Sequence, residues 1–147
     1  FHGDNLDPNR AGPNFERFVR RGAKMIIYSG TADASVKAPS VAEFADKLQT
    51  SYGQERAESF ARTFFVPGMG HCGGGPATDV FDVLTPLVDW VEKGEAPQRI
   101  VAQATAGNNL DPNRTGVSRP LCVYPRYARY NGSGDVTSAA SYSCVVD

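Results

Sequence analysis

Two polar residues follow the two most strand-like segments of the sequence. Asp33 comes shortly after the apolar run 24–29, and His71 comes shortly after the β-branched and aromatic run 63–66. An imidazole can take a proton from an alcohol and return it, and a carboxylate beside the ring fixes its tautomer and stabilises its charged form. This pair therefore predicts the acid and the base of nucleophilic hydrolysis.

The nucleophile that would complete this chemistry is missing. No serine lies in a G-x-S-x-G pattern, the sharp turn that exposes a nucleophilic hydroxyl. The chain supplies an acid and a base but, taken alone, is not expected to be an enzyme.

Each of these residues also has a simpler explanation. Asp33 could serve only as a turn or cap residue, and a lone histidine is often an ordinary surface residue. Cys72 could be a reactive thiol or a metal ligand together with His71 and His2, but the regular Cys/His spacing of zinc sites is absent. The glycine-rich loop that leaves the ring of His71 unobstructed favours the catalytic interpretation.

The elements that must position these residues alternate between helices and strands. The first predicted helix is capped by Asn14 and ended by Gly22, and a strand over 24–29 follows it. The second helix is opened by the capping box Ser40 and Glu43 and ends near Gly53. A strand over 63–66 and a helix over 79–93 complete the order. This order indicates a parallel α/β sheet, in which reacting groups gather at the carboxyl ends of the strands. Residues beyond 100 show no clear periodicity and are expected to form a turn-rich tail.

The last predicted helix contains a proline. Either Pro86 kinks one helix over 79–93, or Thr85 caps a shorter helix that has Pro86 at its first position. Trp90, Phe81 and the leucines near them are expected in the core.

Length and charge restrict what the chain can do. Its 147 residues fit one domain or part of one. Fifteen Lys and Arg against sixteen Asp and Glu leave a formal charge of −1, so the long-range attraction of a basic domain to nucleic acid or anionic lipid is missing. The apolar runs are far shorter than the roughly 20 residues that span a bilayer. Neither nucleic acid nor a membrane is expected as a partner.

The three cysteines indicate an oxidising compartment. Cys122 and Cys144 lie in a Gly-, Ser- and Tyr-rich segment, where a disulfide could contribute on the order of 3 to 4 kcal/mol, and Cys72 is left over. The sequons at Asn113 and Asn131 are compatible with export. The first residues do not resemble a signal peptide, so an exported chain would have been processed or would be a piece of a longer one.

Four segments resemble a known family. They are 28–33 (YSGTAD), 68–75 (GMGHCGGG), 89–97 (DWVEKGEAP) and 119–125 (RPLCVYP). Together they are similar to the C-terminal region of the tannase and feruloyl esterase family, and the resemblance covers nearly the whole chain. Its most specific element is Cys72 directly after His71. The chain differs from the family pattern at Ser29, where His is more usual, at Val123, where Pro is more usual, and at Pro86.

The resemblance implies an α/β-hydrolase fold, in which the triad follows the chain order serine, acid, histidine. By this resemblance Asp33 is the acid, His71 is the base, and Cys72 is one half of a disulfide to a cysteine directly before the missing serine. Cys122 and Cys144 look like the family's C-terminal structural disulfide. The serine, the oxyanion-hole donors and a lid with a structural calcium site would lie in a preceding segment.

The resemblance further implies a serine carboxylesterase that cleaves small esters of hydroxycinnamic or gallic acid and needs no cofactor for catalysis. Residues 1–147 would be the C-terminal part of one α/β-hydrolase domain, a sheet with flanking helices and a disulfide-closed tail. The expected partner is the remaining N-terminal part of the enzyme, on the same chain or on a separate one linked through Cys72. The expected location is secreted or periplasmic.

Two alternatives stay open. One is a non-catalytic, secreted, disulfide-bonded module that binds a carbohydrate or a protein. The other is a hydrolase of the same family that acts on polyester monomers.

Overall fold

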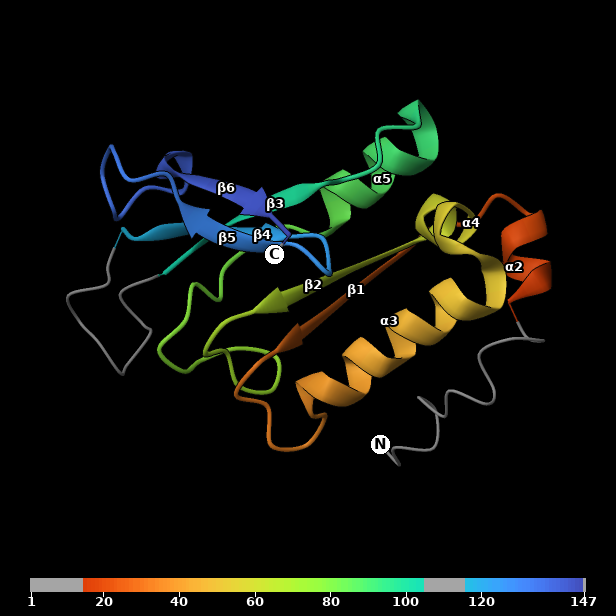
Figure 1. Ribbon diagram of the computed structural model, residues 1–147, viewed down its shortest axis with the longest axis horizontal. Helices are drawn as coiled ribbons and strands as arrows, with labels where there is room; N and C mark the ends of the chain where they lie inside the picture. Colours follow the sequence, from red (N-terminus) through yellow and green to blue (C-terminus); the bar gives the residue numbers. More distant parts are fainter. Residues whose placement is uncertain (1–14, 105–115, 147) are drawn as a thin grey trace.

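The computed structural model describes residues 15–104 and 116–146, which form an α/β arrangement with three two-stranded sheets. The elements, in chain order, are α2 (Glu16–Arg20), β1 (Met25–Gly30), α3 (Ala38–Tyr52), α4 (Gln54–Phe60), β2 (Ala61–Val66), α5 (Leu84–Lys93), β3 (Arg99–Gln103), β4 (Ser118–Cys122), β5 (Tyr127–Tyr130), the short 3-10 helix η4 (Ala139–Ser141) and β6 (Tyr142–Val145). In Figure 1, α3 runs along one side of β1 and β2, the C-terminal strands lie on the other side, and α2 and α4 lie near the ends where the two strands begin.

The two predicted strands are confirmed as a parallel pair. They run in register from Met25 opposite Ala61 to Gly30 opposite Val66. The segment between the predicted second helix and the predicted second strand, for which no element was predicted, is the helix α4. Because the strands are parallel and in register, the loops that follow them leave the same edge of the sheet side by side.

The predicted capping box is wrong. Helix α3 begins at Ala38, with Lys37 at its N-cap and no side-chain cap, so Ser40 and Glu43 lie within the helix. A proline in the first turn of α3 explains the earlier start, since its fixed φ suits a helix and its missing N–H would have had no partner there. The shorter helix α2 has Phe15 at its N-cap, and Asn14, the predicted cap, lies outside the described residues.

Helix α5 is shorter than predicted. The Oδ1 atom of Asp82 accepts the backbone N–H groups of Leu84 and Thr85 at 2.8 Å and 3.1 Å, and the helix begins there. Pro86 therefore sits in the first turn, where its missing N–H costs little, and neither sequence alternative is right in detail. Trp90 is buried as predicted, but Leu84 is 67% exposed and does not belong to the core.

The predicted turn-rich tail is wrong, because the C-terminal region forms two antiparallel pairs. Strand β3 pairs with β4, and β5 pairs with β6. These strands have only four or five residues each, too few for a clear sequence pattern, and their pairing joins segments distant in the chain.

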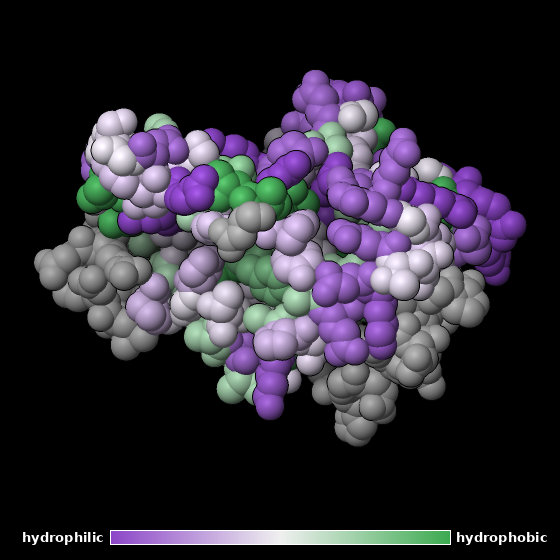
Figure 2. Space-filling model, viewed as in Figure 1, coloured by the Kyte–Doolittle hydropathy of each residue, from purple (hydrophilic) through white to green (hydrophobic). Residues whose placement is uncertain are grey.

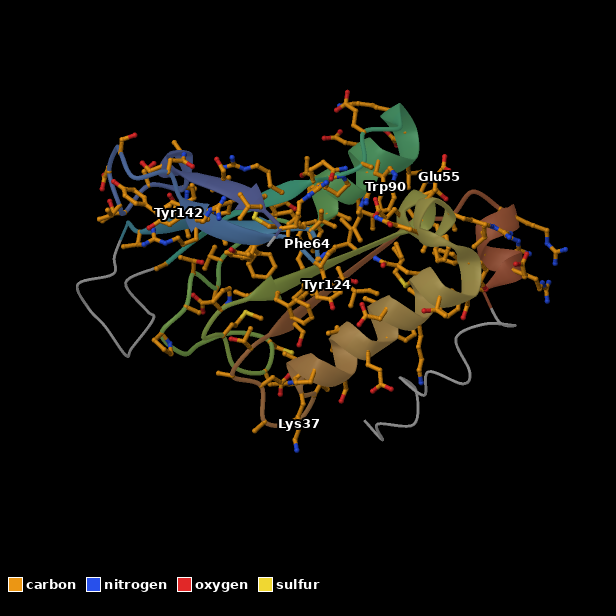
Figure 3. The ribbon with its side chains drawn as sticks, viewed as in Figure 1. Lys37, Glu55, Phe64, Trp90, Tyr124 and Tyr142 are labelled. Atoms are coloured by element: carbon orange, nitrogen blue, oxygen red, sulfur yellow. A yellow bond between two sulfur atoms is a disulfide. The ribbon has the colours of Figure 1, made fainter. Side chains whose placement is uncertain are left out.

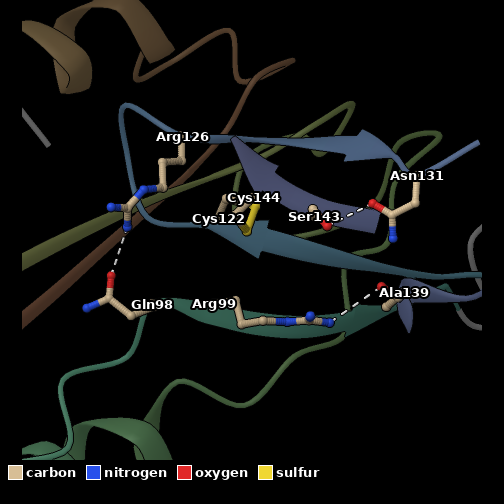
Figure 4. The surroundings of a disulfide bond; sticks show 8 residues. All are labelled: Gln98, Arg99, Cys122, Arg126, Asn131, Ala139, Ser143 and Cys144. Atoms are coloured by element: carbon tan, nitrogen blue, oxygen red, sulfur yellow. Dashed lines mark hydrogen bonds between the residues drawn. A yellow bond between two sulfur atoms is a disulfide. The ribbon is translucent and has the colours of Figure 1, made fainter. Parts of the chain in front are cut away.

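The predicted disulfide between Cys122 and Cys144 is confirmed, with a Cα–Cα distance of 5.6 Å. It links β4 to β6 (Figure 4). In the same region the Ser143 hydroxyl donates to Oδ1 of Asn131 at 2.7 Å. Asn131 is exposed, whereas Asn113, the asparagine of the other sequon, lies outside the described residues.

The core has two parts. One lies between β2 and the C-terminal strands and includes Phe64, Val66, Met69 and Leu121, each no more than 2% exposed; Figure 3 shows Phe64 in this layer. The other part is built from side chains of α3 and α4, with α2 and β1 packed against it. On the face shown in Figure 2, hydrophilic side chains gather over α3 and α4. No helix in 15–104 or 116–146 is long and apolar enough to cross a membrane.

Candidate active site

The site lies where β1 and β2 end. Gly30 and Val66 are opposite each other at the last position of the register. Asp33 lies in the loop after β1, and His71 lies in the loop after β2. The two sequence-predicted residues are brought together, with 2.8 Å between His71 Nδ1 and Asp33 Oδ2.

Both oxygens of the Asp33 carboxylate are occupied. Oδ1 accepts the backbone N–H groups of Ser35 at 2.7 Å and Val36 at 3.0 Å, and Oδ2 accepts from His71. These bonds hold the pKa of Asp33 below its usual 3.8, with the hydrogen bond to His71 as the largest cause and the Val36 N–H as the next. The carboxylate is therefore ionised at neutral pH and locked in orientation.

The ring of His71 has one nitrogen engaged and one available. An ionised carboxylate can only accept, so Nδ1 carries a hydrogen, and in the neutral ring Nε2 then has the free lone pair. The side chain of His71 is 54% exposed, whereas that of Asp33 is 6% exposed. In the described part of the chain, no serine hydroxyl bonds to His71. The pair can act as a general base towards an alcohol that another segment supplies.

Three hydrogen bonds tie the Asp33 loop to the segment that leads to His71. The N–H of Thr31 donates to the Val66 carbonyl at 3.0 Å, and the N–H of Ala32 donates to the Met69 carbonyl at 3.0 Å. In the other direction, the N–H of Gly68 donates to Thr31 Oγ1 at 2.8 Å.

The His71 loop is also closed on itself. The Gly70 N–H donates to the Gly74 carbonyl at 3.3 Å, and the Gly74 N–H donates to Asp79 Oδ2 at 2.8 Å. A side chain at Gly75 would collide with the Gly68 carbonyl, which explains the glycine there. Thr31 and Asp79 are two site residues that the sequence analysis missed, since threonine and aspartate in polar turns give no distinctive pattern.

Cys72 is an exposed free thiol directly after His71. Its φ of +62° lies in the left-handed region, which non-glycine residues rarely adopt. The backbone at this position is therefore held by the loop around it rather than by the preference of cysteine.

No metal centre is formed by the described side chains. Among them, no group of three or more His, Cys, Asp or Glu residues could hold a metal ion. His2, considered above with Cys72 and His71, lies outside the described residues. The calcium site implied by the family resemblance would lie in a preceding lid.

Neither of two cavities in the described structure contains Asp33 or His71. The larger, about 410 Å³, lies behind the histidine loop, between residues that include Gly68 and Pro76 and C-terminal residues that include Arg119 and Tyr142. The smaller, about 20 Å³, lies between α3, α4 and the start of β2. Neither cavity therefore forms a pocket for an acyl group beside His71.

Residues 8–145 match the family model described as tannase and feruloyl esterase. A mono(2-hydroxyethyl) terephthalate hydrolase from Piscinibacter sakaiensis is 48% identical over 130 residues, which are 86% of this chain and 20% of that protein. The fold is similar to that of an esterase from Aspergillus oryzae, with a TM-score of 0.75 and 28% identity over 92% of this chain and 29% of the other.

A feruloyl esterase B from Aspergillus oryzae has a similar fold as well, with a TM-score of 0.72 and 27% identity over 88% of this chain and 28% of the other. These neighbours are esterases of the α/β-hydrolase type, so the predicted fold class is confirmed. The chain spans about a fifth of the length of the Piscinibacter relative and under a third of each of these solved chains.

Proposed function

Since this chain belongs to the tannase and feruloyl esterase family, we propose that it is the acid- and base-bearing part of a carboxylic ester hydrolase that cleaves esters of aromatic acids. The observation that carries the proposal is the hydrogen bond of 2.8 Å between His71 Nδ1 and Asp33 Oδ2 at the carboxyl edge of two parallel strands. An exposed imidazole braced by an ionised carboxylate is the arrangement that general-base chemistry requires.

In the proposed reaction, Nε2 of His71 takes the proton of a serine hydroxyl as the oxygen attacks the ester carbonyl. The imidazolium that forms is stabilised by the Asp33 carboxylate and then gives its proton to the departing alcohol. The remaining acyl-serine is released by a water molecule that His71 deprotonates in the same way, and the proton finally returns to the serine oxygen.

The serine would come from the remaining N-terminal part of the protein, on the same chain or on a second one. The exposed thiol of Cys72 beside the base supports a disulfide to a cysteine directly before that serine, which would fix nucleophile and base to one another. In such a protein, oxyanion-hole donors and a lid that contacts the aromatic acid would also lie outside this chain.

The surface of the chain supports packing against a remaining part of the protein of this kind. In the described residues β1 pairs only with β2, so its other edge is free to extend the sheet. On β1 itself, Tyr28 packs edge-on against Phe81 and is 45% exposed, and on α5 Leu84 and Val91 are 67% and 58% exposed. An open strand edge together with exposed apolar side chains of this size fits a chain that is one part of a larger sheet.

The bonded pair Cys122 and Cys144 supports a secreted or periplasmic location, because disulfides form and persist in oxidising compartments.

The test is Asp33→Asn in the complete protein, assayed with methyl ferulate and methyl gallate. Asparagine can still accept the Ser35 and Val36 N–H groups but cannot stabilise an imidazolium, so kcat is expected to fall on the order of 10⁴-fold, as in other serine-hydrolase triads. The matched control is Asp82→Asn, since Asp82 caps α5 through the same kind of backbone contacts away from His71. Near-normal turnover by the Asp33 variant would show that the assignment is wrong.

A second candidate substrate is a terephthalate monoester, favoured by the 48% identity to a mono(2-hydroxyethyl) terephthalate hydrolase. Both candidates share an aromatic acyl group and differ in the ring substituents and the alcohol. Comparing kcat/KM for methyl ferulate, methyl gallate and mono(2-hydroxyethyl) terephthalate decides between them.

The rival from outside the enzyme class is a non-catalytic, disulfide-bonded secreted module. The mass of the Cys72 peptide under non-reducing conditions separates the two. A crosslink to a peptide that contains Cys-Ser supports the hydrolase, whereas a free thiol in the mature protein favours the module.

A further inference from the structure

We infer that Thr31 is a positioning residue for the acid and base pair, and that its hydroxyl holds the Asp33 loop in register with the loop that carries His71. The inference rests on the proposed function, because positioning matters to turnover only where this pair does the chemistry. Its structural basis is the hydrogen bond of 2.8 Å from the Gly68 N–H to Thr31 Oγ1.

The need for this hydroxyl follows from the turn that ends β2. The Met69 N–H donates to the Val66 carbonyl at 3.2 Å, with Pro67 and Gly68 at the two central positions. Proline at the first and glycine with a φ of +76° at the second are typical of a type II turn. In such a turn the N–H of the second central residue points away from the turn, so any hydrogen-bond acceptor for it lies outside the turn.

Thr31 supplies that partner from the neighbouring loop, only two residues before the acid. Besides the bond between His71 and Asp33, three hydrogen bonds tie the two loops together. Two of them join backbone groups, and this one depends on a side chain. Removing the Thr31 hydroxyl would leave the Gly68 N–H without this acceptor. It would thereby loosen the turn that leads into the loop carrying His71. The pair spans 2.8 Å between Nδ1 and Oδ2, so small relative movements of the loops weaken it.

The experiment compares Thr31→Val, which removes only the hydroxyl at nearly constant shape, with Thr31→Ser, which keeps it, in the complete protein. Thr31→Val is expected to lower kcat roughly tenfold and to leave KM unchanged, since a displacement of the pair by about half an ångström acts on the chemical step. Thr31→Ser is expected to restore wild-type kcat. Thr31→Ala provides a second hydroxyl-free variant if the valine variant does not fold.

A cycle with Asp33→Asn separates positioning from a general structural role. If Thr31 acts through the pair, Thr31→Val costs less than about twofold in the Asp33→Asn background, because there is no imidazolium stabilisation left to lose. An equal loss in both backgrounds, or full activity of Thr31→Val, would overturn the inference while the triad stands. If Asp33→Asn itself turns over normally, the proposed function fails instead.

Discussion

Replacing Gly30 by alanine is expected to separate the acid from the base. Gly30 is the last residue of β1 and packs directly against the start of the histidine loop. A Cβ atom on Gly30 would lie 2.6 Å from the Gly70 carbonyl oxygen, and it would also collide with the Met69 carbonyl oxygen. These neighbours are backbone atoms, so the methyl group cannot be accommodated by a side-chain rotation.

The size of the effect follows from the contact distances. An ordinary Cβ contact lies at 3.4–4 Å, so the Gly70 contact alone requires the two loops to separate by about 0.8 Å. If that movement is passed to the Asp33 and His71 side chains, their 2.8 Å hydrogen bond lengthens to about 3.6 Å, outside the range of a good N–H···O bond. A displacement of this order is expected to lower kcat roughly 10²-fold.

The assay is kcat for methyl ferulate in the complete protein, with circular dichroism to confirm that each variant is folded. The control is Gly94→Ala at the C-terminus of α5, where a Cβ meets nothing within 4 Å but φ is +77°. That variant is expected to lose about 1 kcal/mol of stability from left-handed backbone strain and to keep its kcat. A folded Gly30→Ala variant with kcat within threefold of wild type would refute the reasoning.

Two further predictions concern stability, both measured by urea denaturation of the complete protein. Removing the disulfide by the double change Cys122→Ala and Cys144→Ala is expected to lower the free energy of unfolding by about 3 kcal/mol. The loss comes from the closure entropy of a loop with a sequence separation of 22. A loss well below about 1 kcal/mol would contradict this prediction. The pKa of Asp33 is lowered on folding, chiefly by the hydrogen bond to His71. The ionised carboxylate therefore stabilises the fold at pH values above the unfolded pKa of 3.8, and this stabilisation is lost as the pH falls through the lower pKa of the folded state. The stability difference between wild type and Asp33→Asn is therefore expected to shrink between about pH 5 and pH 2, and a difference that stays constant over that range would count against the assignment.

Local sequence patterns were sufficient for the elements whose signals are contained within a few residues. The apolar run of β1 and the β-branched and aromatic residues of β2 predicted two strands, and both strands are confirmed. Strand β2 is mostly buried, whereas β1 is only partly buried. Glycines marked the ends of α3 and α5 correctly, at Gly53 and Gly94. The pairing of Cys122 with Cys144 followed from the cysteine count and the composition of the tail.

Predictions failed where two segments distant in the chain decide the structure. Helix α5 starts late partly for a local reason, because Asp82 Oδ1 accepts the N–H groups of Leu84 and Thr85. The distant reason is the bridge between Val80 and Gln103, which pairs the residues before the helix with β3. The C-terminal strands are too short to show a pattern and exist because partner strands complete their hydrogen bonds. The start of α3 differs from the prediction for a local reason, because the proline in its first turn favours a helix that begins at Ala38, before the capping-box residues.

The sequence by itself determined which two side chains meet, since Asp33 and His71 follow successive strands of a parallel sheet and must lie at the same edge. Only the tertiary structure decided the register that sets Gly30 opposite Val66, the hydrogen bond from Gly68 to Thr31, and the 2.8 Å between the two side chains. The physical reason is that residue types and spacing specify which groups are present and roughly where, whereas hydrogen-bond distances depend on non-local packing, which a short stretch of sequence does not encode.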